Sequence, residues 1–204
     1  MSWEHAVIAA AVGYLLGSVP TGMIVARVYR DVDLTAYGSG RTGATNALRT
    51  LGKGAAAVVF AGDFAKGLVA VLLVSLTTDG NPWAELLAAA GAVIGHSYSP
   101  FIGFKGGRGV VTGLGATLVA APWLMLIAFA IGILLVAVTR YVSLGSVVGS
   151  TVGGVFLVGL AVATHDPAWA VWGVLVGGFI VVAHRDNIGR LLSGTERKLG
   201  ERAG

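Results

Sequence analysis

Cysteine is absent from this 204-residue chain, so disulfide bonds and thiolate sites are excluded. Charged residues are also scarce, at 12% of the sequence, where a soluble domain usually has about a quarter. Hydrophobic residues make up 55%, which is more than a single core can bury. We therefore expect an all-α integral membrane protein, in which lipid covers much of the apolar surface.

Seven apolar runs follow one another along the chain, and each is a candidate membrane helix. A hydrocarbon core of about 30 Å takes roughly 20 apolar residues per helix, and the third and fourth runs are shorter. They flank the loop 95–109, so we expect helices that end inside the membrane around a polar pocket. Pro122 is expected to mark a turn or a kink. The runs are 3–26, 54–76, 83–95, 110–121, 123–139, 142–163 and 168–183.

The expected fold is one transmembrane domain, residues 1–204, built as a compact bundle of about seven helices, with five spans as the alternative. With seven spans, 13 of the 14 lysines and arginines fall on one face, in three loops and the tail. Because cytoplasmic loops collect Lys and Arg, we expect an outside N-terminus and a cytoplasmic C-terminus. This placement explains the net charge of +4 without nucleic-acid binding. The basic segments are 27–53, 95–109, 140–141 and 184–204.

Lys66 is the remaining cation, and it lies inside the second apolar run, one helical turn after Asp63. Residues three apart share a helix face, and an unpaired charge inside a membrane is costly. A structural ion pair is the favoured interpretation, and a part in an active site is the other.

The first basic loop contains a glycine-rich stretch. Three glycines within residues 38–43 let the backbone approach a ligand and point N–H groups at it. We expect a short helix at 44–51, and a glycine turn that runs into a helix N-terminus can bind an anion. Taken alone, the pattern fits a plain re-entrant turn equally well. The candidate residues are Gly38, Gly40, Gly43, Thr45, Asn46 and Arg49.

The second basic loop contains Lys105-Gly106-Gly107-Arg108-Gly109, which places two cations around a flexible backbone. It is not a Walker A sequence, but backbone donors and positive charges suit a phosphate in the same way. Anchoring at the cytoplasmic face would explain the charges but not the glycines, so we favour phosphate binding. His96 precedes this stretch, and a histidine at a helix end more often makes a structural hydrogen bond.

A third cluster follows the last apolar run, where His184 and Asn187 lie one turn apart on one face. Ser143 adds a hydroxyl on the same side of the membrane. Interfacial anchoring is the alternative interpretation. Two anion-binding loops and a polar pair on one face indicate two phosphorylated ligands, or one ligand with two phosphates.

In order and over nearly the whole chain, these motifs resemble the bacterial acyl-phosphate:glycerol-3-phosphate acyltransferase family, known as PlsY. Two positions depart from the family pattern: Arg41 stands where Asn is usual, and Arg108 where Lys is usual. Arg108 keeps the charge as a fork suited to bidentate phosphate contact, whereas Arg41 adds a charge beside the site. The matching stretches are Leu16–Gly22, Gly38–Arg49, Asp63 with Lys66-Gly67, Gly95–Gly109, Arg140–Ser143 and His184–Glu196.

The resemblance implies transfer of a fatty acyl group from acyl phosphate to the 1-hydroxyl of sn-glycerol 3-phosphate. The products would be lysophosphatidic acid and inorganic phosphate, in the first acylation step of phospholipid synthesis. It also implies an enzyme without cofactor or metal in the bacterial inner membrane, with its site facing the cytoplasm. We further expect that it functions as a monomer.

Carried over by motif position, Ser39 would position substrate and Arg49 would hold the phosphate of glycerol 3-phosphate. The loop 105–109 would bind phosphate, and His184 and Asn187 would complete the site by hydrogen bonding. The donor's own phosphate oxygens could accept the hydroxyl proton, and a covalent acyl-enzyme at Ser39 is the alternative.

Three other functions compete with this one. A transporter of phosphate or an organophosphate also uses interrupted helices and glycine-rich loops, but its site is expected at the midplane, within an inverted repeat. A CDP-alcohol phosphotransferase needs clustered aspartates for metal, which the scattered acids here do not supply. A non-catalytic assembly protein would leave the glycine loops unexplained.

Overall fold

The computed structural model describes residues 1–201, and the chain is helical throughout, with no β-strand among these residues. Three residues of the predicted tail, 202–204, lie outside the described part. The α-helices are α1 (Trp3–Gly17), α2 (Thr21–Arg30), α3 (Ala44–Thr50), α4 (Lys53–Thr77), α5 (Pro82–Ser97), α6 (Val110–Ala120), α7 (Pro122–Thr139), α8 (Val142–Thr164), α9 (Pro167–Trp172), α10 (Gly178–Ala183) and α11 (Arg185–Leu192). Shorter helical segments are η1 (Leu34–Ala36), η2 (Pro100–Ile102) and the π-helical η3 (Gly173–Gly177).

All seven predicted apolar runs form helices. Four stretches are long and apolar enough to cross a membrane. The first combines α1 and α2, and the other three are α4, α7 and α8. The last apolar segment and α11, bent by 57° from each other, would make a fifth. At about 1.5 Å per residue, the 11 residues of α6 rise only roughly 16 Å. The number of complete crossings therefore stays a prediction, but the integral membrane character of the fold is clear.

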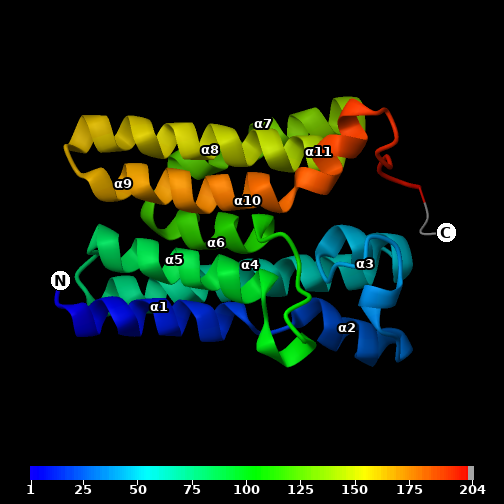
Figure 1. The fold of residues 1–204 in the computed structure, drawn as a ribbon, viewed down its shortest axis with the longest axis horizontal. Coiled ribbons are helices and arrows are strands. Elements are labelled where there is room, and N and C mark those ends of the chain that lie inside the picture. The colour runs from blue at the N-terminus through cyan, green and yellow to red at the C-terminus, as the bar shows by residue number, and fades with distance from the viewer. Residues whose placement is uncertain (202–204) are drawn as a thin grey trace.

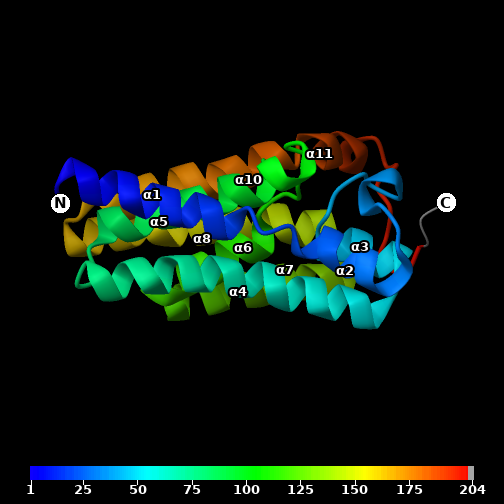
Figure 2. The same cartoon turned by 90° about the horizontal axis from the view of Figure 1, so that it is seen from below.

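The helices run side by side along the long axis of the molecule (Figure 1). In that view α1, α4 and α5 lie on one side, α7, α8 and the α9–α10 segment lie on the other, and α6 lies between them. Helix α1 packs along α5, α4 along α6, and α7 along α8. The short α6 is therefore enclosed by its neighbours, as the turned view also shows (Figure 2).

Glycines set the closest of these helix contacts. A side chain at Gly13 or Gly17 of α1 would overlap the backbone of α5, and one at Gly91 or Gly95 of α5 would overlap the backbone of α1. Lipid tails are as apolar as leucine, so helices in a membrane associate mainly through such close packing. The abundance of glycine follows partly from this requirement.

The helices are interrupted where the sequence contains proline or where polar residues begin. Pro20 follows the end of α1, so the predicted run 3–26 is broken before α2. Pro122 begins α7 directly after α6, which confirms the predicted turn. The last apolar run contains the π-helical η3, a feature often found at functional sites.

One end of the bundle collects the connecting segments that the sequence marked as basic. Helices α2, α3 and α11 lie at this end, together with the end of the described chain, and the N-terminus lies at the other (Figure 1). The turn between α7 and α8 joins them, because Arg140 and Leu199 exchange backbone and side-chain hydrogen bonds. Four segments far apart in sequence therefore meet in space.

We predict that Gly17→Val destabilises the protein, because the new methyl groups would overlap Ala92 of α5. Overpacking of this kind costs about 1–3 kcal/mol. Thermal unfolding in detergent should show a lower Tm than for the wild type. Gly159→Val is the matched control, since a Cβ added there meets no atom within 4 Å apart from its own stretch of helix. An unchanged Tm for Gly17→Val would contradict the packing described here.

Candidate active site

A cavity of about 600 Å³ opens among the basic segments and extends between the helices. Its polar part takes residues from three of these segments and from the start of α8. Those residues are Gly38, Ser39, Arg41, Gly43, Thr45, Asn46, Arg49, His96, Gly107, Arg108, Gly109, Ser143, His184, Asp186, Asn187, Arg190, Glu196 and Arg197.

The other part of the cavity is apolar and lies between α6, α7, α8 and the segment from α9 to α10. Glycines of α8 form one wall, and larger side chains close it. The lining there includes Met125, Ala128, Phe129, Ile133, Gly149, Gly153, Leu157, Trp172, Val176 and Ile180. A cavity with a basic mouth and an apolar extension fits a molecule with a phosphate head and a hydrocarbon tail.

The first glycine loop is organised by Asn46, whose side chain is 2% exposed. Its Nδ2 donates to the carbonyl oxygens of Leu34, Tyr37 and Arg41 at 3.0, 3.0 and 2.8 Å. Its Oδ1 accepts from the Ser39 N–H at 3.1 Å. These bonds occupy the amide, so Asn46 holds the loop in shape, which differs from the ligand contact predicted from the sequence.

That loop turns sharply at two glycines. Gly38 and Gly40 have φ angles of +59° and +65°, a region that residues with side chains rarely adopt. Ser39 lies between them with its side chain exposed at the cavity. The predicted helix after the loop is present as α3, and it brings Thr45 and Arg49 to the same cavity.

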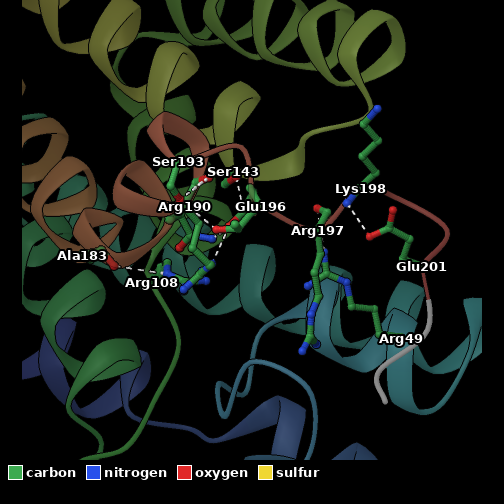
Figure 3. Close-up of polar contacts among 12 residues, drawn as sticks. Arg49, Arg108, Ser143, Ala183, Arg190, Ser193, Glu196, Arg197, Lys198 and Glu201 are labelled. Carbon is green, nitrogen blue, oxygen red and sulfur yellow. Dashed lines mark hydrogen bonds and ion pairs between the residues drawn. The ribbon is translucent and has the colours of Figure 1, made fainter.

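The second glycine loop folds back onto the end of α5. The N–H groups of Gly106 and Gly107 donate to the carbonyls of Ser97 and His96, at 3.0 and 3.2 Å. Arg108 Nε donates to the Ala183 carbonyl at 3.2 Å (Figure 3). Burial, with help from nearby Arg41, lowers the pKa of Arg108 to about 10, so Arg108 remains charged at neutral pH.

The two cations of this loop point to different places. Arg108 lines the main cavity together with Gly107 and Gly109. Among the described residues that line this cavity, neither Lys105 nor Gly106 is found. Lys105 lies instead in a second depression of about 450 Å³, beside Arg27. The sequence grouped all five loop residues into one phosphate site, and the structure divides them.

Glu196 connects the third cluster, and sequence reasoning gave it no role. Its Oε1 accepts from Ser143 Oγ at 2.7 Å, and its Oε2 accepts from Arg190 Nε at 2.7 Å (Figure 3). Oε1 also accepts from Asn187 Nδ2 at 2.6 Å. Burial alone would raise the pKa of Glu196, but these three hydrogen bonds lower it below its ordinary value. Glu196 is therefore a carboxylate that fixes two predicted site residues.

His184 is 3% exposed, and its Nδ1 lies 2.7 Å from the Ile180 carbonyl oxygen. A carbonyl can only accept, so Nδ1 carries the proton. In the neutral ring Nε2 is then the acceptor. His184 lies at the bend between α10 and α11 and lines the cavity. The bond to Ile180 fixes the orientation of its ring.

The tail crosses the mouth of the cavity and contacts Arg49. Arg49 Nη2 donates to the Arg197 carbonyl at 3.3 Å, and the two side chains lie side by side (Figure 3). Lys198 lies over the Tyr141 ring, 5.5 Å from its centre. Burial, followed by the neighbouring Arg197 charge, lowers the pKa of Arg49.

Arginines thus dominate the charge of the cavity mouth. Five line the cavity, against the three carboxylates of Asp63, Asp186 and Glu196. The positive excess suits anionic groups such as phosphates, and guanidinium forks can bind them bidentately. The five are Arg41, Arg49, Arg108, Arg190 and Arg197. Within residues 1–201, no group of three or more His, Cys, Asp or Glu residues could hold a metal ion.

We predict that Asn46→Asp lowers turnover strongly, because a carboxylate would face the three carbonyls to which the amide now donates. A lost hydrogen bond that leaves buried groups unpaired costs about 1–3 kcal/mol. Asn81→Asp is the matched control, since Asn81 only accepts N–H bonds at the start of α5, as an aspartate can. Activity per folded protein is the measurement, and equal activity of the two variants would contradict the role of Asn46.

Comparison with known proteins agrees with this geometry. A family model described as glycerol-3-phosphate acyltransferase matches residues 7–194. The glycerol-3-phosphate acyltransferase of Synechococcus sp. (strain JA-3-3Ab) is 45% identical over 202 residues, covering 98% of this chain and 97% of the relative. That of Clostridioides difficile (strain 630) is 42% identical over 200 residues, covering 96% of each.

Two crystal structures of PlsY (YgiH), an integral membrane glycerol 3-phosphate acyltransferase, have the same fold. The glycerol 3-phosphate form has a TM-score of 0.87 at 36% identity and covers 96% of both chains. The lysophosphatidic acid form has a TM-score of 0.85 at 35% identity and covers 96% of this chain and 95% of that one. On sequence and on fold, this chain belongs to the glycerol-3-phosphate acyltransferase family.

Proposed function

We propose that this protein transfers a fatty acyl group from acyl phosphate to the 1-hydroxyl of sn-glycerol 3-phosphate. The products are lysophosphatidic acid and inorganic phosphate, and the reaction is the first acylation of phospholipid synthesis. The observation that carries the proposal is the single cavity that joins an arginine-rich mouth to an apolar extension. A phosphate-bearing acceptor fits the mouth, and the tail of the donor fits the extension.

The related structures support this choice of ligands. PlsY has been solved in a glycerol 3-phosphate form and in a lysophosphatidic acid form. The first ligand is the acceptor of the proposed reaction, and the second is its lipid product. A transporter of organophosphates would need no apolar extension beside the phosphate site, so the shape of the cavity favours acyl transfer.

The chemistry requires alignment more than activation. The hydroxyl oxygen attacks the acyl carbon and forms the ester bond, and the bond from that carbon to the phosphate oxygen breaks. The electron pair leaves with the phosphate, which also accepts the hydroxyl proton. Because the mixed anhydride is already reactive, the protein contributes by holding both substrates in contact and by stabilising charge.

The residues divide into three roles. Arg49 and Arg108 bind phosphate groups, with the glycine turn at 38–43 and the backbone at 108–109 supplying further contacts. Ser39 positions the acceptor, and His184 offers Nε2 for a hydrogen bond. Asn187 and Ser143 are held by Glu196, so their contribution is to shape the wall of the site.

The site faces the cytoplasm of a bacterium in this proposal, and the protein is a multi-pass protein of the inner membrane. The one-sided lysines and arginines support this orientation. Glycerol 3-phosphate then enters from the cytoplasm, and acyl phosphate enters from the inner leaflet. As the family resemblance suggested, we also propose that a monomer is active and that neither cofactor nor metal takes part.

We expect the purified protein to form labelled lysophosphatidic acid from labelled glycerol 3-phosphate and acyl phosphate. Acyl-CoA, offered as the control donor, should give none. Failure with acyl phosphate would refute the proposed function, and equal product from acyl-CoA would refute the choice of donor. Ser39→Ala and Arg49→Ala should abolish turnover while the protein still inserts. Arg30→Ala removes an exposed arginine elsewhere and should leave the rate unchanged.

We also expect Gly153→Leu to shift the preference toward shorter acyl chains. Gly153 is buried on the wall of the apolar extension, 3.1 Å from Met125 Cε if a Cβ is added. A few carbon atoms in such a pocket change kcat/KM by about tenfold or more. The measurement is the ratio of kcat/KM for long-chain and medium-chain acyl phosphates. Gly159→Leu, on an open face of the same helix, is the control and should leave the ratio unchanged. An unchanged ratio for Gly153→Leu would show that the acyl chain does not lie in the apolar extension.

A further inference from the structure

Four polar side chains meet inside the bundle, next to the cavity but outside its loops. They are Thr21 at the start of α2, Asp63 and Lys66 on α4, and His96 near the end of α5, and we call them the polar junction. Lys66 Nζ lies 2.9 Å and His96 Nδ1 3.3 Å from Asp63 Oδ1, and Thr21 Oγ1 donates to the same oxygen. Asp63, Lys66 and His96 are 2%, 8% and 6% exposed. The predicted ion pair is thus present, with two further partners.

On one side the polar junction holds the break between α1 and α2. Lys66 Nζ donates to the Val19 carbonyl at 2.9 Å. Thr21 follows the break, and its neighbour Gly22 packs so closely on Thr42 that a side chain there would overlap the Thr42 carbonyl. Thr42 belongs to the first glycine loop. A displacement of Asp63 would therefore also shift that loop, through the Asp63–Thr21 contact and the Gly22–Thr42 contact.

On the other side the polar junction supports the second glycine loop. The carbonyl of His96 accepts the Gly107 N–H at 3.2 Å. The His96 ring also lies against Gly107, where any Cβ would overlap Nε2. Asp63 and His96 both line the cavity. The imidazole therefore packs directly against the turn that precedes Arg108, and its Nδ1 lies 3.3 Å from Asp63 Oδ1.

Stability alone does not explain this arrangement. A buried ion pair recovers its desolvation cost only with good geometry, and replacing both charges with apolar groups is often neutral or stabilising. Neutralising Lys66 would need one contact from Asp63, yet the same oxygen also contacts Thr21 and His96. The contact with Thr21 connects Asp63 to the first glycine loop, and the contact with His96 connects it to the second.

We infer that Asp63 and His96 are positioning residues for acyl transfer. Together they fix the distance between the first and second glycine loops, so that the phosphate groups held there are aligned for reaction. The inference rests on the proposed function, because it assigns each loop a phosphate of that reaction. Neither residue needs to touch the reacting atoms.

The test separates positioning from simple charge neutralisation. The double variant Asp63→Leu/Lys66→Met removes both buried charges and the oxygen that Thr21 and His96 share, so no lone charge is left in the membrane. If the pair were only structural, the double variant would match the wild type in kcat and KM per folded protein. If Asp63 positions the loops, kcat/KM for glycerol 3-phosphate falls by about 100-fold, the effect of a misplacement near 1 Å. The inhibition constant for inorganic phosphate then also rises.

His96→Ala is the second variant, because it leaves the Asp63–Lys66 ion pair in place and so stays informative if the double variant does not fold. The same loss of kcat/KM and of phosphate inhibition is expected for it. Glu85→Gln is the matched control: Glu85 is also a buried acid, 4% exposed, but lies at the opposite end of α5 from His96. It should leave kcat, KM and phosphate inhibition unchanged.

Two results would overturn the inference. One is normal kcat/KM in folded His96→Ala, and the other is normal kinetics in the folded double variant. Absence of acyl transfer in the wild type would instead overturn the proposed function. In that case binding of inorganic phosphate, measured by calorimetry on wild type and His96→Ala, still decides whether His96 supports an anion-binding loop: equal affinity refutes it.

Discussion

Lipid cannot hydrogen-bond a peptide group, so every helix that ends at membrane depth must have its free carbonyls satisfied by protein. The polar end of this bundle meets that requirement with side chains. Ser99 Oγ donates to the Ser18 carbonyl at 2.6 Å, and Lys66 Nζ donates to that of Val19. Arg108 does the same for Ala183 at the bend before α11. The breaks in the helices and the polar residues of the site therefore depend on one another, which explains why they occur together.

The charged side chains of the cavity are likewise held in place by specific hydrogen bonds. Glu196 pairs with Arg190 and at the same time orients Asn187 and Ser143. Arg49 and Arg108, by contrast, donate to the backbone carbonyls of Arg197 and Ala183. A carbonyl satisfies a guanidinium N–H without neutralising its charge. Positive charge is thus held in place by the fold while remaining available to an anion.

The long helices could be predicted closely, since α8 spans Val142–Thr164 where an apolar run was expected at 142–163. Hydrophobic length determines such helices. The break at Pro20 was missed, because the apolar residues continue through it and periodicity does not detect an interruption. The π-helical η3 was missed for the same reason, since a single widened turn leaves the composition unchanged.

The candidate site shows a different limit. Glycine spacing correctly indicated that two loops would meet at a cavity, because backbone flexibility is visible in residue type. It could not show that Lys105 and Arg108, three residues apart, enter different depressions. Nor could it show that the Asn46 amide is occupied by carbonyls 5, 9 and 12 residues earlier. Such partners depend on how the loop folds back on itself.

The short α6 links the packing of the bundle to the shape of the cavity. Side chains at Gly67 of α4 and Gly115 of α6 would each overlap the other helix's backbone, so these two helices lie in direct contact. With α6 drawn against α4, Gly113 and Leu114 of α6 line the cavity. Because α6 starts at the residue after Gly109, the same contact fixes where the second glycine loop ends. Close glycine packing on one face of α6 therefore determines both the room for a hydrocarbon chain and the position of the loop that would bind its phosphate.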